Sequence, residues 1–344
     1  MSGPATHPTV AILQVSQILD GARLRGLDTA AILRRAGIAP GLLDAPLSRV
    51  TQSQYAALIL LLRRLLRDEL WGLCSRPLKP GSFEQGCRLL MGCRTLGEAL
   101  RTGLAYYHLL IDDFAPRLVV DGAQAEVRLV SRVPREPRQG FAERTFCFFS
   151  FGLASWLVAR RIPVQALLYR PSDEGHSSDG ARLFQAAVRY DSPWVGYRFD
   201  ARWLDLPVVQ TPHTLQEFLR QAPAGLLVRY RDQTSLSERI RRLLRRQLAG
   251  DMPSLEAVSA ALALTPQTLR RRLSEEGQGF QTLKDELRRD AAIEFLGQPE
   301  LTLADIAARL GFSEASTFHR AFKTWTGLTP SEYRLTRRSS RDGV

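Results

Sequence analysis

The sequence has few of the residues on which several classes of protein depend. Its four cysteines in 344 residues are too few for a disulfide scaffold, and none lies in a C-x-x-C pair, so we expect reduced thiols. They are Cys74, Cys87, Cys93 and Cys147. The longest wholly apolar run, Tyr55–Leu62, has eight residues, whereas a membrane-spanning helix needs about 20. The segment MSGPATHPTV lacks the basic and apolar regions of a secretory signal. We therefore expect a cytoplasmic protein that does not enter a membrane.

Motifs for catalysis and for metal binding are also missing. The sequence has no G-x-x-x-x-G-K-[ST], H-E-x-x-H or G-x-S-x-G segment. Its five histidines are far apart along the chain and do not have the spacing of metal ligands: His7, His108, His176, His213 and His319. We therefore expect no catalytic residues, no metal and no cofactor, and a protein that is not an enzyme.

Lysine is scarce, although the chain is basic. Only three of the 47 basic side chains are lysines, and the formal net charge is +12. Arginine stays charged and makes planar bidentate contacts, which suits nucleic acid or another polyanion; codon bias explains the ratio equally well. Residues 236–344 hold 18 basic and 14 acidic side chains. Charge alone therefore does not locate a DNA-binding domain.

The hydrophobic period divides the chain into two parts. At about 150 residues per domain, its length suggests two domains. Apolar spacings of three and four predict helices at Val10–Leu24, Thr29–Ala36, Gln52–Leu70, Phe83–Met91 and Leu96–Leu110. The dipeptide Asp121-Gly122 predicts a hairpin. It joins strands at Arg117–Asp121 and Ala125–Val130. The elements predicted after this hairpin are a helix at Phe141–Arg160, a strand at Val164–Tyr169, a helix at Ala181–Ala186 and one or two strands at Val188–Phe199. We expect an α+β domain over residues 1–220.

The remainder is predicted to be helical. Proline, glycine and polar residues at 221–235 indicate a linker, and residues 236–340 form the expected second, all-α domain. Ser237–Leu248 predicts a basic amphipathic helix. Its arginines could contact phosphates or belong to a solvated face.

A weak internal repeat with a period of about 48 residues occurs in this second part. Leu255–Leu273 and Leu303–Phe322 each predict helix, short turn and helix, with Thr265 and Ser313 as N-caps of the second helices. Gly311 supplies the positive φ that such a turn tends to need. The first copy has Ala263 there, which indicates a less strict turn. We thus expect two helix-turn-helix units joined by a linker helix.

The second helix of each unit has polar side chains that must face outward. They are Gln267, Thr268, Arg270, Arg271 and Ser274 in the first unit, and Ala315, Ser316, Thr317, His319 and Arg320 in the second. Arginine pairs with guanine and glutamine with adenine in the major groove. The predicted joining helix, Gln281–Leu296, spans roughly 24 Å. With half a unit at each end it could hold two recognition helices about 34 Å apart, one DNA turn. The alternative is a helical bundle whose exposed arginines are merely solvated.

The segment Ile306–Arg334 closely resembles the signature of AraC/XylS-type transcription regulators: IA, GF, S-x-F-x-R-x-F-K and G-x-T-P-x-x-Y-R, with the wider match over Ser254–Arg334. The resemblance implies a regulator, usually an activator, that binds double-stranded DNA. It places Gln267, Arg270, Arg271, Ser274, Ala315, Ser316, His319 and Arg320 at base- or phosphate-contacting positions. Ala315 can offer only a methyl contact.

The front half resembles the N-terminal domain of one branch of this family, in AAILRRAGIAPGLLDAP, GCRTLGEALR and LFQAAVRYDSPWVGYRFDARWLDLPV. The resemblance implies a domain that binds a small organic effector and forms a homodimer. The effector could be a hydrophobic carboxylate held by an arginine, although no single arginine stands out.

An aromatic helix is the candidate wall of the effector site. Phe141, Thr145, Phe148 and Trp156 fall near one face of it, and we expect Tyr106 and His108 to face the same space. Packing of this face against a sheet is the alternative. Two other functions are alternatives: a scaffold whose front domain binds a protein or only dimerises, and a DNA-repair enzyme, which would need a reactive cysteine cluster near the N-terminus.

Overall fold

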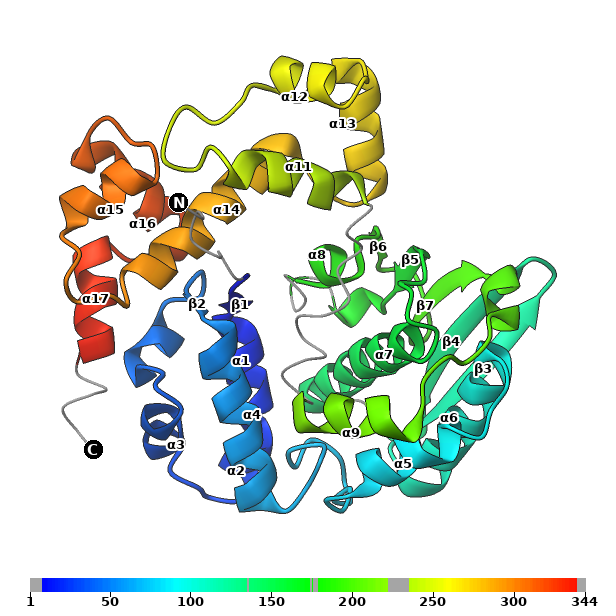
Figure 1. The fold of residues 1–344 in the computed structure, drawn as a ribbon. Coiled ribbons are helices and arrows are strands. Elements are labelled where there is room, and N and C mark those ends of the chain that lie inside the picture. The colour runs from blue at the N-terminus through cyan, green and yellow to red at the C-terminus, as the bar shows by residue number, and fades with distance from the viewer. Residues whose placement is uncertain (1–7, 135, 174, 176–178, 222–234, 339–344) are drawn as a thin grey trace. The chain divides into compact units, whose positions relative to one another are not determined.

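The structure is a computed structural model that describes residues 8–134, 136–173, 175, 179–221 and 235–338 (Figure 1). The chain forms two compact units. A helical unit comprises residues 1–16, 29–58 and 233–344, and a sheet unit comprises 17–28 and 59–232. Most of the expected linker, 221–235, lies outside the described residues. The domain limits 1–220 and 236–340 stay a prediction.

The sheet unit is built on a five-stranded sheet with the order β3-β4-β7-β5-β6. Its strands are β3 (Phe114–Asp121), β4 (Gln124–Ser131), β5 (Val164–Leu168), β6 (Val188–Arg189) and β7 (Val195–Asp200). Asp121 pairs with Gln124, so Gly122, with φ +53°, lies in a two-residue hairpin loop as its D-G dipeptide predicts. All pairings are antiparallel except that of β5 with β6.

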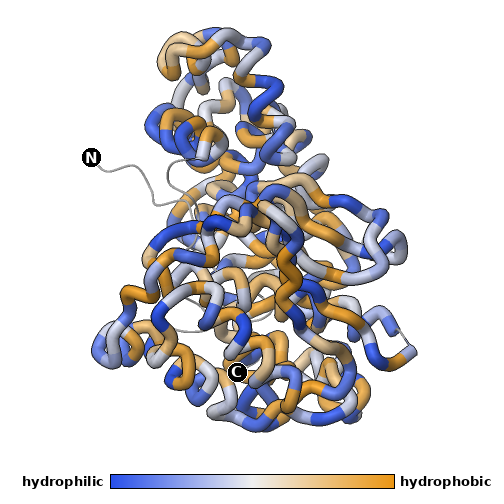
Figure 2. Tube along the Cα trace, turned by 90° about the vertical axis from the view of Figure 1, so that its right-hand side faces the viewer, coloured by the Kyte–Doolittle hydropathy of each residue, from blue (hydrophilic) through white to orange (hydrophobic). Residues whose placement is uncertain are grey.

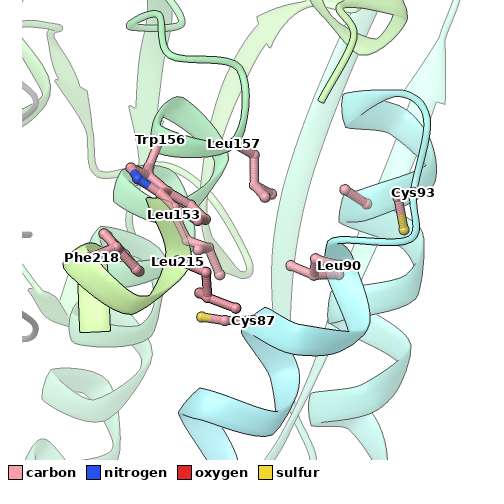
Figure 3. Packing of buried hydrophobic residues seen from close by; sticks show 9 residues of the cluster. Cys87, Leu90, Cys93, Leu153, Trp156, Leu157, Leu215 and Phe218 are labelled. Carbon is pink, nitrogen blue, oxygen red and sulfur yellow. The ribbon is translucent and has the colours of Figure 1, made fainter. Parts of the chain in front are cut away.

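Several helices belong to the sheet unit, and α6, α7 and α8 among them contact its strands. The helices are α2 (Asp20–Leu24), α5 (Ser82–Leu90), α6 (Leu96–Leu110), α7 (Pro137–Leu157), α8 (Gly180–Phe184) and α9 (Pro212–Gln221), with short turns η2 (Pro171–Asp173) and η3 (Ala201–Asp205). Helix α6 contacts β3, and α7 contacts β4 and β7. Figure 3 shows side chains of α5, α7 and α9 pointing toward one another, and the rings of Trp156 and Phe218 stack with centroids 4.2 Å apart. The aromatic helix α7 is therefore a central core element.

Two predicted helices end or begin elsewhere. The helix predicted over Gln52–Leu70 is α4 (Gln52–Leu66), because Arg67 takes φ +50° and the buried Asp68 carboxylate accepts the backbone N–H groups of Leu70, Gly72 and Leu78. Helix α7 begins at Pro137, four residues before the predicted start. The Glu136 and Gln139 side chains form a capping box there.

The prediction of one helix over Val10–Leu24 is wrong. Val10 and Ala11 form strand β1, which pairs antiparallel with β2 (Arg49–Val50) in the helical unit. The chain then continues as α1 (Ile12–Ile18) and α2. Strand pairing removes Val10 and Ala11 from the helix because their backbone groups bond to a distant segment, a contact that a local period does not contain.

The C-terminal part of the helical unit contains the two expected helix-turn-helix units. Its helices are α11 (Leu236–Arg245), α12 (Leu255–Ala261), α13 (Pro266–Glu275), α14 (Phe280–Phe295), α15 (Leu303–Arg309), α16 (Ala315–Thr326) and α17 (Pro330–Arg338). Helix α12 packs on α13, α15 packs on α16, and α14 contacts α11 and α16. The joining helix α14 has 16 residues, the predicted length. The N-terminal part of the unit contributes α3 (Thr29–Arg35) and η1 (Pro40–Asp44) beside β1 and β2.

The turns of the two units have the same backbone geometry. Ala263 has φ +53° and Gly311 has φ +72°. Leu264 N–H donates to the Ser259 carbonyl at 2.9 Å, and Phe312 N–H donates to the Ala307 carbonyl at 3.0 Å. The expectation of a less strict first turn is therefore wrong: the first unit keeps the left-handed turn and places an alanine in it, at the cost of crowding between its Cβ and the backbone.

Buried polar contacts join the two ends of the chain within the helical unit. Thr9 Oγ1 donates to Asp290 Oδ1 at 2.5 Å, and Arg49 donates from Nε to Thr9 Oγ1 and from Nη2 to the Thr9 carbonyl, both at 2.7 Å. The Tyr333 hydroxyl donates to the Arg49 carbonyl. All four residues are buried. The signature tyrosine of the C-terminal motif thus binds a strand that is 284 residues away in sequence.

Hydrophobic residues do not gather into one long apolar helix. Figure 2 shows hydrophilic and hydrophobic residues mixed along the whole tube. Among the described residues, no helix is long and apolar enough to cross a membrane.

The shared turn predicts opposite effects for two small substitutions. Ala263→Gly removes the Cβ crowding at an exposed position and should raise the free energy of unfolding by about 1 kcal/mol. Gly311→Ala should lower it by more than this, because a Cβ there would lie 2.3 Å from the Gly250 carbonyl oxygen. Chemical denaturation of both variants measures the difference. Equal changes of the same sign would contradict the assignment of matching turns.

Candidate nucleic-acid interface and ligand cavity

Helix α13 buries one side and exposes the other. Leu269 and Leu273 are buried, and Thr265 is the N-cap, as predicted, with its side chain accepting the Thr268 N–H. Four predicted contact residues, spaced i, i+3, i+4 and i+7, share the exposed side: Gln267, Arg270, Arg271 and Ser274. Thr268 is half-buried beside the cap.

Helix α16 has the same two-sided design with larger core residues. Phe318 and Phe322 are buried, and their ring centroids are 5.8 Å apart. The predicted N-cap Ser313 is wrong, because α16 begins at Ala315 and Glu314 occupies the N-cap position without a side-chain bond. Four of the predicted residues are exposed, namely Ala315, Ser316, Thr317 and Arg320. The fifth, His319, is half-buried. Both recognition helices thus present their predicted faces.

The side chains best suited to base contacts are unpaired. Gln267, Arg270 and Arg320 make no side-chain hydrogen bond or ion pair with another described residue. Arg271 lies 3.5 Å from Glu275, an exposed i,i+4 pair, and Ser316 donates to Glu314 at 3.0 Å. Exposed pairs of this kind are weak, so they do not prevent these side chains from turning to a ligand.

Lys323 is a residue that the sequence reasoning missed. It is exposed, three residues after Arg320 and four after His319 on α16. The i+3 and i+4 spacing places it beside them, and this spacing was a signal available in the sequence.

The arginines of α11 serve partly as internal supports. Arg241 is buried and pairs with Glu286 at 2.8 Å, and Arg245 pairs with Glu238 at 3.1 Å. Glu276 in turn accepts the N–H groups at the start of α11. Only Arg239, Arg242 and Arg246 are exposed. Phosphate contact is therefore open to part of this run. Of the rest, Arg241 ties α11 to α14, and the Arg245–Glu238 pair lies within α11.

A cavity of about 250 Å³ lies inside the sheet unit. The α7 residues that line it are Phe146, Phe149, Ser150, Leu153, Ala154 and Leu157. Opposite walls come from α5, α6, α9 and the segment after α4, with residues that include Leu70, Trp71, Phe83, Leu90, Leu100, Leu104, Tyr107 and Leu219. Such a mostly apolar hollow with few polar groups is the usual form of a small-molecule site.

The six predicted ligand residues are placed elsewhere. Trp156 stacks on Phe218, Phe148 contacts Phe184, and the Tyr106 hydroxyl donates to the Ser82 carbonyl. The Arg132 guanidinium donates to the His108 ring. The six predicted residues are Tyr106, His108, Phe141, Thr145, Phe148 and Trp156. None of them lines this cavity. They stay a prediction. The cavity uses a neighbouring face of the same helix, together with Tyr107.

The described residues contain no cluster of three or more histidine, cysteine or acidic side chains that could hold a metal ion. All four cysteines are buried. Burial raises the pKa of the Cys147 thiol well above its usual range, and a nearby Glu143 raises the pKa further. Cys147 is thus a neutral, packed side chain.

Two helix-turn-helix units with exposed polar faces on their second helices are typical of a DNA-binding transcription regulator. A family model for the arabinose-binding N-terminal domain of AraC transcription regulators matches residues 26–208, and a helix-turn-helix domain model matches residues 258–336. The chain belongs to the AraC family of transcription regulators.

Two relatives align over nearly the whole chain. The ornithine utilization regulator of Pseudomonas aeruginosa is 29% identical over 331 residues, which covers 96% of this chain and 97% of the relative. An uncharacterized HTH-type transcriptional regulator of Mycobacterium tuberculosis is 30% identical over 341 residues, covering 95% and 96%. The regulator VirS of the same species is 38% identical over 167 residues, 48% of each chain. These relatives are named as regulators, not as enzymes.

The second recognition helix yields a prediction with a matched control. Arg320→Ala should weaken binding to the specific duplex by about 1–3 kcal/mol and spare binding to a random duplex, because a bidentate base contact is lost. Arg272→Ala removes the same charge from an exposed position of α13 that flanks its buried side, and it should change specific binding little. Gel-shift titration on both duplexes measures the effect. Equal loss on both duplexes would show that Arg320 is a phosphate contact.

Proposed function

We propose that the protein is a ligand-responsive, sequence-specific transcription activator that works as a homodimer. The observation that carries the DNA-binding part is the pair of exposed faces on α13 and α16, where the side chains of Gln267, Arg270 and Arg320 make no hydrogen bond or ion pair with a described residue. Side chains with free donors on a helix of this type are those that read base edges.

Both recognition helices would enter successive major grooves of one duplex. The 16 residues of α14 span roughly 24 Å. A separation of about 34 Å between the two recognition helices would match one turn of DNA. Gln267, Arg270, Arg271 and Ser274 would read one groove, and Ala315, Ser316, Thr317, His319 and Arg320, with Lys323, would read the next. Thr268 would approach the sugar-phosphate backbone of the DNA.

The response to a ligand would come from the cavity in the sheet unit. Its effector would be a small organic molecule with an apolar body, and a hydrophobic carboxylate is the class that the sequence suggests. The effector must bind the DNA-competent state more tightly than the other state, or it shifts no equilibrium. The proposal includes no catalytic activity.

A scaffold whose sheet unit only dimerises or binds another protein is the second candidate. The apolar cavity of about 250 Å³ favours the effector, because a purely structural core is close-packed. Thermal-shift screening of metabolites discriminates the two candidates, since a scaffold gains no stability from any small molecule.

Hydroxyl-radical footprinting tests the arrangement on DNA. Each protomer should protect two patches about 10 base pairs apart on one face of the duplex. A single protected patch would mean that one unit alone engages, contrary to the proposed mode. Repeating the footprint with Arg270→Ala should weaken one patch selectively.

The ligand response yields a prediction about truncation. A chain that begins at Ser235 should bind DNA more weakly and respond to no metabolite, because it lacks the cavity and also leaves Asp290 and Tyr333 without Thr9 and Arg49. DNA affinity is measured with and without a metabolite extract. The full-length Arg49→Met variant is the control: it loses the contacts with Thr9 but keeps the cavity, so it should still respond. If the unmodified full-length protein responds to no extract, the effector proposal is wrong.

A further inference from the structure

We propose that Arg63 is the acid-recognising residue of the cavity and that the effector is therefore a carboxylic acid with an apolar body. This inference rests on the proposed ligand-responsive function and assigns the charge of the ligand in the same cavity. The charged and polar side chains of the cavity wall differ in whether they have partners within the protein.

The acidic side chains of the wall are already satisfied. Glu69 accepts the backbone N–H of Gly81 at 2.8 Å and that of Phe83 at 2.7 Å. Glu84 pairs with Arg88 at 2.6 Å, one helical turn away. Both line the cavity. Glu69 is held by two backbone groups, whereas the exposed Glu84–Arg88 pair is weak and holds its carboxylate less firmly.

Arg63 is the unsatisfied charge of the wall. It lines the cavity, is half-buried, and makes no hydrogen bond or ion pair with any residue that the structure describes. A guanidinium offers five N–H donors and accepts none, so its natural partner is a carboxylate. Because the remaining wall is mostly apolar, the charge attraction acts in surroundings that screen it less than water does.

A second, arginine-rich hollow adjoins Arg63. Arg63 also lines this hollow, whose other residues are Leu60, Arg64, Arg67 and Pro80. Arg64 and Arg67 are exposed and likewise have no partner among the described residues. Arg63 is thus common to an arginine-rich hollow and to the apolar cavity. An anion is attracted to the first, and its apolar body fits the second.

Tyr107, the tyrosine of the cavity wall, is also suited to binding an anion. The Tyr107 hydroxyl has no hydrogen-bond partner among the described residues, and burial holds the pKa of this group well above its usual range. Tyr107 therefore stays neutral and can donate a proton in a hydrogen bond to an anion. Its role is to supply a donor, whereas Arg63 supplies the charge.

A structural explanation for Arg63 is that a cation near the end of α4 stabilises the helix dipole. Arg64 lies in the same last turn and provides the matched control. It shares the dipole effect and the second hollow, but it does not line the cavity. A dipole role predicts equal effects of the two substitutions, and a ligand role predicts a large effect of Arg63 alone.

The experiment is isothermal titration of the full-length protein with straight-chain carboxylates from hexanoate to dodecanoate and phenylalkanoates of like size, each beside its amide. At least one acid should bind, and its amide should bind about 10- to 100-fold more weakly, the loss expected for a charge-assisted hydrogen bond. Arg63→Met should remove this preference for the acid. Arg64→Met should keep it, and Arg63→Lys should restore part of it.

The outcomes separate this inference from the proposed function. If no acid binds, or if acid and amide bind equally, the assignment of Arg63 is wrong. If a metabolite extract still changes DNA affinity in that case, the ligand-responsive function stands with another class of effector. Equal loss in Arg63→Met and Arg64→Met would also overturn the proposal. Thermal unfolding of each variant without ligand establishes that the fold is intact.

Discussion

The helical unit depends on a buried set of polar contacts between the first and the last parts of the chain. Asp290 lies on α14, and its carboxylate is buried. Burial of an ion costs several kcal/mol unless it is paired and hydrogen-bonded. Thr9 donates to it, Arg49 holds Thr9, and Tyr333 binds the Arg49 carbonyl. Helices α14 and α17, which adjoin the second helix-turn-helix unit, are therefore supported by residues from the opposite end of the sequence.

The same buried contacts explain the structural role of the signature residues that end the second unit. Gly327 ends α16 with φ +77°, and Thr329 caps α17 by bonding with Glu332, which lowers the pKa of that carboxyl. This sharp turn sets Tyr333 on the buried side of α17. The G-x-T-P-x-x-Y segment thus supports α16 from within the protein.

Helix α4 belongs to both units. Its residues up to Leu58 are part of the helical unit, and Ile59 to Leu66 are part of the sheet unit, where Arg63 lines the cavity. A ligand that contacts Arg63 would therefore contact a helix that begins in the helical unit, where Thr51 alone separates it from strand β2. The chain itself connects the ligand cavity with the segment that holds Tyr333.

The outward faces of α13 and α16 could be read from the sequence because helix periodicity is local. Burial of Leu269 and Leu273 leaves Arg270 and Arg271 outside, whatever the rest of the chain does. The length of α14 followed from the same periodicity. The turn at Ala263 was misjudged, because the propensity of a single residue is weaker than the packing and hydrogen bonds that impose its conformation.

By itself the sequence determined the repeated helix-turn-helix units, their exposed side chains and the α+β character of the front half, since each follows from periods and turn residues within a few positions. Only the tertiary structure decided the pairing of Val10 with Val50, the order of the sheet and the face of α7 that borders the cavity. An aromatic helix has apolar residues on several faces. Which of them meets empty space depends on α5, α6 and α9, and therefore on contacts that no local pattern encodes.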